Sequence, residues 1–282
     1  MGKWYNKIFV GNPNKEDFTN KDLPKTRLEQ FFDVVKLRFS SLITGNLIFA
    51  LFAVPLMVFT LFLLFGINFA ESSEIDFGVE FADHLNLFLL VAIPLYTIMG
   101  PATAGLYYCI RNWIWNERAT IKEHFWKEFK RSFWKSIFIN FFNALLMYAF
   151  VFWMDILVSN SAEYPIFKIL QIVLLIVVVL YYMSSIYHYP QLVTYNLTLR
   201  QIFKNSFIYL TVQFPRTLLA VLAYLAIMLL TVLLSKVLAV VMICIGVSFT
   251  FLAQMILSDF IFDKYVNEPE RQRKGMAPIN KK

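Results

Sequence analysis

The sequence predicts an all-α, polytopic membrane protein with six transmembrane helices and both termini in the cytoplasm. Of its 282 residues, 59% are hydrophobic and 16% are charged, whereas soluble domains average ~45–50% apolar and about 25% charged residues. Its apolar residues fall into runs long enough to cross a ~30 Å hydrocarbon layer. Its Lys and Arg residues gather in alternate segments between these runs. No long polar block interrupts the pattern, so a single membrane domain is expected.

Three regions follow from this pattern. Residues 1–41 form a cytoplasmic N-terminal segment that contains an amphipathic helix, residues 42–262 form the six-span membrane domain, and residues 263–282 form a cytoplasmic basic tail. The predicted spans are residues 42–65, 85–110, 136–157, 166–189, 217–234 and 238–260. The final apolar run, residues 217–262, would reach ~69 Å as one helix. We therefore expect it to fold back at Ser235-Lys236, and we expect Pro55 to kink the first span.

Charge fixes the predicted orientation. Of the 26 Lys and Arg residues, 24 lie in the segments 1–41, 111–135, 190–216 and 263–282. Basic loops stay in the cytoplasm, so the acidic loop 68–84, which has five carboxylates and no Lys or Arg, lies outside. The net charge of +7 thus reports topology and attraction to anionic lipid rather than nucleic-acid binding. The acidic loop is either simply solvated or a site for Ca²⁺ or sugar hydroxyls.

Amphipathic segments are predicted at 25–41, 111–135 and 190–216, all on the cytoplasmic face. The middle segment carries an aromatic stripe with basic residues around it. It is either a helix on the lipid surface or a docking helix for a cytoplasmic partner. A faint repeat, FKRSF at 129–133 and FKNSF at 203–207, occurs in two of these segments. The candidate docking residues are Phe125, Trp126, Phe129, Phe133 and Trp134.

Small residues interrupt the second span at Gly100, Pro101, Ala104 and Gly105. Such residues allow the backbones of neighbouring membrane helices to approach closely, so we expect helix packing here. The alternative is a hinge or docking point at Gly100-Pro101. The spacing is not that of a phosphate-binding loop, since no Lys-Ser or Lys-Thr pair follows.

No catalytic, cofactor-binding or metal-binding residues are predicted. His84, His124 and His188 lie far apart and form no short ligand motif, and both cysteines lie in apolar segments. The central part of each span lacks charged residues, which argues against an ion-coupled transporter. Five amides in the spans either line a passive pore or form interhelical hydrogen bonds. They are Asn46, Asn140, Asn143, Gln171 and Gln254.

Three stretches carry a family resemblance: IPLYTIMGPATAGLYYCIRNWIWNE, then FWKEFKRSFWKS, then YYMSSIYHYPQLVTYNLTLRQIFKNSF with FPRTL. Over roughly residues 28–235 the chain resembles the YesL-like family of bacterial integral membrane proteins, a family of unknown function. The matching motif residues are Gly100, Pro101, Ala102, Leu106, Tyr107 and Tyr108. The longer first span and the acidic loop depart from many members.

The resemblance implies a multi-pass protein of the bacterial cell membrane. Such proteins are often encoded beside carbohydrate ABC importers, sensor kinases and glycoside hydrolases. This implies a non-enzymatic accessory subunit that contacts the permease subunits of an oligosaccharide ABC importer, with the ATPase supplied by another chain. The alternatives are a stand-alone transporter or channel for a small neutral solute, or a membrane scaffold or sensor partner.

Overall fold

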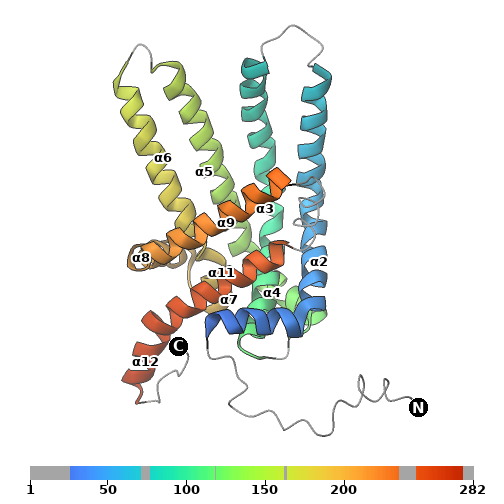
Figure 1. Cartoon of the computed structure of the whole chain (residues 1–282), viewed down its shortest axis with the longest axis vertical. Coiled ribbons are helices and arrows are strands. Elements are labelled where there is room, and N and C mark those ends of the chain that lie inside the picture. The colour runs from blue at the N-terminus through green and yellow to red at the C-terminus, as the bar shows by residue number, and fades with distance from the viewer. Residues whose placement is uncertain (1–25, 71–76, 118, 162–163, 235–245, 276–282) are drawn as a thin grey trace, which may run out of the picture.

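The computed structural model describes the backbone of residues 26–70, 77–117, 119–161, 164–234 and 246–275, and the side chains of these except 61–70, 77–84 and 227–234. Every regular element in these ranges is helical. The all-α fold class is therefore confirmed for the described part of the chain. Helices α2, α3, α5 and α6 run along the long axis of the molecule, and α9 and α11 cross them obliquely (Figure 1).

The first helix, α2 (Arg27–Ala70), joins the predicted amphipathic helix to the first span. The break between them lies at Arg38, whose φ of −122° and ψ of 18° are not helical. The residues before this break lie across the lower end of the long helices (Figure 1). Pro55 lies inside α2 and keeps helical dihedral angles, since only Arg38 departs from them, so the expected kink at Pro55 stays a prediction.

The second long helix, α3 (Phe77–Ile114), is followed by a π-helical turn, η2 (Ile121–Phe125), and by α4 (Trp126–Arg131). The next antiparallel pair is α5 (Phe133–Ser159) and α6 (Ile166–Ser185). Helix α6 exposes apolar side chains around most of its circumference, such as Ile172 and Val177. A helix that is apolar on nearly every side suits a hydrocarbon environment.

The remaining helices are shorter. They are α7 (His188–Thr194), α8 (Leu199–Val212), α9 (Phe214–Leu234), α11 (Val247–Phe262), the π-helical turn η4 (Asp263–Asn267) and α12 (Glu268–Arg273). Helices α8 and α9 meet at a bend of 96°. Described parts of the segments predicted to be cytoplasmic, with a few residues next to them, lie toward the lower end of the molecule in Figure 1. We call this part of the molecule the base. It comprises residues 27–38, 111–135, 188–212 and 259–273, as far as these are described.

Four described helical segments are long and apolar enough to cross a membrane, and a fifth is added if the bent pair α8–α9 counts as one span. The four are Arg27–Thr60, Leu85–Ile114, Phe133–Ser159 and Ile166–Thr194. These segments make the chain compatible with a membrane protein, but the prediction of six spans is not confirmed. The predicted turn at Ser235-Lys236 lies outside the described residues.

The larger apolar core surrounds the second half of α3, where Ala102, Leu106 and Ile110 have no exposed surface. Side chains from α2, η2, α5, α7, α8 and α11 complete this core. A smaller cluster joins the end of α6 to α8 and α11 through Tyr187, Leu210 and Phe262. Both clusters lie toward the base, so this end of the molecule is held together by apolar contacts between consecutive and distant helices.

Candidate functional site

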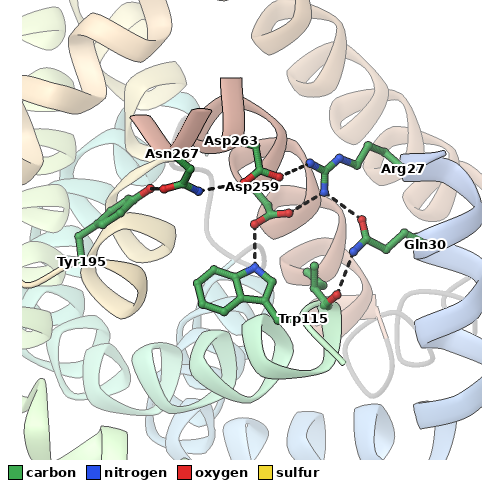
Figure 2. Close-up of polar contacts among 8 residues, drawn as sticks. Arg27, Gln30, Trp115, Tyr195, Asp259, Asp263 and Asn267 are labelled. Carbon is green, nitrogen blue, oxygen red and sulfur yellow. Dashed lines mark hydrogen bonds and ion pairs between the residues drawn. The ribbon is translucent and has the colours of Figure 1, made fainter. Parts of the chain in front are cut away.

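A network of ion pairs and hydrogen bonds joins several helices at the base of the molecule (Figure 2). Arg27, at the start of α2, donates hydrogen bonds of 2.6 Å to both Asp259 of α11 and Asp263 of η4. The indole N–H of Trp115 donates to the second oxygen of Asp259 at 2.8 Å. Asp259 is only 1% exposed. A buried carboxylate needs such partners, because its removal from water is otherwise very costly.

Three further hydrogen bonds extend this network. The Gln30 amide donates to the backbone oxygen of Ile114 at 2.9 Å, which joins α2 to the end of α3. The Asn267 amide donates to Asp263 at 2.9 Å and accepts from the Tyr195 hydroxyl at 3.1 Å. Residues separated by more than 200 positions are thus fixed together. The arrangement fastens both described ends of the chain to the base, and the sequence analysis did not identify it.

The small residues of α3 lie at its closest contacts. A Cβ added at Gly100 would lie 2.7 Å from the carbonyl carbon of Ser136 and closer still to its oxygen. At Gly105 it would lie 2.9 Å from both a ring carbon and the backbone oxygen of Phe125. Ala104 has no exposed surface, and Pro101 is buried. The helix-packing interpretation therefore agrees with the structure, and α3 continues as a helix through Gly100-Pro101 rather than breaking there.

The predicted aromatic stripe divides into a buried side and an exposed side. Phe125 has no exposed surface and packs on Gly105, so it cannot contact a partner in this structure. Phe129 and Phe133 are half-buried. Trp126 and Trp134 are 40% and 79% exposed. Docking stays a prediction, with the two tryptophans as its most exposed residues, while Phe125 packs the segment against α3.

A buried carboxylate also stabilises this segment. Glu128 is 1% exposed, accepts a hydrogen bond from the Ser132 hydroxyl and pairs with Arg131 at 2.8 Å. Burial raises the pKa of Glu128 above its usual value, against the opposing effect of Ser132 and Arg131. The ionised form therefore opposes folding relative to the protonated form.

Replacing Glu128 with Gln is expected to flatten the pH dependence of stability. Because the pKa of Glu128 is higher in the folded state, this group adds stability as the pH falls through that raised pKa toward 4.5. The wild type should gain thermal stability from this group between pH 7 and pH 5, and E128Q should not. Melting temperatures of both proteins in detergent at the two pH values test this. An equal pH response in both proteins would contradict it.

The five amides predicted in the spans all form hydrogen bonds between helices. Asn46 of α2 accepts from the Ser248 backbone N–H of α11 at 3.1 Å, and Gln171 of α6 donates to the Leu157 carbonyl of α5 at 2.9 Å. The other three pairings are Asn140 with the Tyr96 carbonyl and the Tyr189 hydroxyl, Asn143 with the Tyr181 hydroxyl, and Gln254 with the Tyr107 hydroxyl. These contacts favour the helix-packing interpretation of the amides over the pore interpretation.

Two of the three histidines, His124 and His188, have described side chains. His124 is half-buried and close to Thr120, and His188 is fully buried beside Phe203, 4.7 Å between ring centroids. Within the described residues no group of three His, Cys, Asp or Glu side chains is placed to hold a metal ion. The side chains of the acidic loop 68–84 lie outside the described residues, so both interpretations of that loop stay predictions.

The repeat brings two serines to equivalent buried positions. Ser132 donates to the Glu128 side chain and Ser206 donates to the Ile202 carbonyl, each four residues earlier. Ser206 also accepts from Gln191 at 2.8 Å. The two similar pentapeptides thus both lie in helical segments at the base, and each buries its serine.

One family model matches part of the chain. Residues 42–155 match the family model described as a protein of unknown function, DUF624. The matched range runs from the core residue Leu42 of α2 to Asp155 of α5. It includes the Gly100 and Gly105 contacts. It also includes the segment that carries the aromatic stripe, which we call the aromatic segment. No curated protein and no solved structure matches the chain.

Proposed function

We propose that this chain is a non-enzymatic accessory subunit of a carbohydrate ABC importer in a bacterial cell membrane. In this proposal it has six spans, both termini are cytoplasmic, and its base contacts the permease subunits from the cytoplasmic side. The observation that carries the proposal is the rigid presentation of Trp126 and Trp134 on the base. The substrate class rests on the family resemblance of the sequence.

The aromatic segment has the features of a preformed docking surface. Its inner side is fixed by Phe125 against Gly105, so little conformational entropy is lost when its outer side binds a partner. Its outer side combines Trp126 and Trp134 with the exposed cations Lys127 and Lys130. Tryptophan is enriched among residues that dominate binding energy at protein interfaces.

A passive transport role receives less support. The five amides that were candidates for lining a pore have partners on neighbouring helices. The described core around α3 is apolar and filled by side chains from six neighbouring helical elements. A binding role at the surface therefore fits the described residues better than a solute pathway between the helices.

Replacing Trp126 and Trp134 together with Ala is expected to weaken retention of the partner by roughly 30-fold or more, since removal of one such residue costs ~2 kcal/mol or more. The experiment is co-purification of the tagged full-length chain from its native membranes in mild detergent, with quantification of bound permease subunits by mass spectrometry.

The matched control is Trp153→Ala. Trp153 is 54% exposed and lies near the far end of α5 from the base. The account expects W153A to retain its partners at the wild-type level. Equal retention by W126A/W134A and the wild type would contradict docking through this surface. Recovery of a sensor kinase in place of permease subunits would instead support a regulatory scaffold.

A further inference from the structure

An apolar groove of about 680 Å³ lies where the α5–α6 pair meets α8. Sites for small molecules typically have volumes of ~300–1,000 Å³. Phe142 of α5, Leu180 of α6 and Phe203 of α8 are among its lining residues. Tyr181 also lines it, but its hydroxyl is satisfied by Asn143 at 2.6 Å. The walls therefore suit a hydrocarbon chain and offer little to a polar solute.

The rim of the groove is open to the apolar outer surface. Phe138, Val177 and Phe207 are 45%, 57% and 42% exposed, one from each of the three helices. Phe138 and Val177 belong to the halves of α5 and α6 nearest the base, and Phe207 belongs to α8 at the base. A hydrocarbon chain enters such a groove from a bilayer without displacing polar groups, so the entrance lies within the leaflet next to the base.

Two basic side chains of α8 lie at this apolar groove. Arg200 lines the groove, and Lys204 follows it by one helical turn on α8; both are exposed. Among the described residues neither forms an ion pair. The first turn of α8 contains no acidic residue, although helix N-termini favour anions and disfavour cations. An anion from outside the chain would therefore find unopposed positive charge here.

We propose that this groove binds one anionic phospholipid, with an acyl chain between α5, α6 and α8 and the phosphate at Arg200 and Lys204. Charge complementarity selects the headgroup, and the apolar walls hold the chain. The lipid also fills the space between α8 and the α5–α6 pair, which stabilises the position of α8 at the base. This inference requires a membrane location and is independent of which partner the base contacts.

The test is native mass spectrometry of the purified full-length chain in mild detergent, with phosphatidylglycerol or phosphatidylcholine added. The wild type is expected to retain one phosphatidylglycerol in preference to phosphatidylcholine. In R200Q/K204Q the ratio of bound phosphatidylglycerol to bound phosphatidylcholine should fall by about 10- to 30-fold, since each basic residue contributes about 1 kcal/mol to anionic lipid binding. Val177→Trp, which fills the groove, should reduce the binding of both lipids.

The matched control is K127Q/K130Q, which removes two exposed cations elsewhere on the base. It should keep the phosphatidylglycerol preference. Equal loss in the control and in R200Q/K204Q would indicate diffuse charge attraction and overturn the proposal, as would equal binding of the two lipids by the wild type. A dimer that is lost in V177W would assign the groove to a second copy. Melting temperatures confirm that each variant is folded.

Discussion

Replacing Gly100 with Leu is expected to prevent folding or to lower the melting temperature by more than any surface substitution. The atoms nearest an added Cβ belong to the backbone of Ser136 in α5, which cannot move aside by changing a rotamer. Helices α3 and α5 must therefore separate along their main contact. Gly100→Ala gives the smaller version of this effect: overpacking costs ~1–3 kcal/mol and outweighs the ~0.8–1.0 kcal/mol that alanine gains in helix propensity.

The measurement is thermal denaturation in detergent, followed by size-exclusion chromatography, for G100A, G100L and a control. Ala223→Leu is the control, because Ala223 is exposed on α9 and has room for a larger side chain. The order of stability should be wild type and A223L, then G100A, then G100L. A melting temperature of G100L equal to that of A223L would show that α3 and α5 do not pack as described.

Replacing Arg27 with Met is expected to cost ~3–5 kcal/mol, the usual loss when one partner of a buried ion pair is removed. Asp259 then remains 1% exposed and loses the cation paired with it, although the Trp115 indole still donates to it. The double variant R27M/D259L should recover much of this loss, because the more deeply buried carboxylate is removed with its cation. Asp263 also loses Arg27, but it is more exposed and keeps its hydrogen bond from Asn267. Chemical denaturation of the single and double variants measures both effects.

The exposed pair of Glu270 and Lys274 provides the matched comparison. Their distance is also 2.6 Å, but both side chains are more than half exposed. Surface pairs contribute little to stability, so Lys274→Met should leave the denaturation curve unchanged. If R27M is also without effect, Arg27 does not fasten the N-terminal helix to α11, and the described network at the base is wrong.

Sequence reasoning predicted features that depend on local spacing. The small residues of α3, the amphipathic helix before residue 41 and the interhelical amides all follow from residue type and period. The division of the aromatic stripe did not follow, because spacing identifies a stripe without saying which side meets the core. Phe125 ends a π-helical turn, Ile121–Phe125, in which the regular helical period does not apply.

The network at the base escaped prediction for a different reason. Arg27 and Asp259 are 232 positions apart, and no local pattern connects them. A signal did exist: Asp259 is a carboxylate near the end of a long apolar run, where an ionised group requires a partner. The prediction of six spans stays unconfirmed, and α9 and α11 lie obliquely to the long helices (Figure 1).

The most direct test of the proposed function is the identity of the proteins that accompany the wild-type chain. The tagged chain would be purified from its native membranes in mild detergent and its partners identified and counted by mass spectrometry. The account predicts sugar-importer permease subunits in near-stoichiometric amounts. Recovery of the chain alone, or only with further copies of itself, would contradict the accessory-subunit proposal.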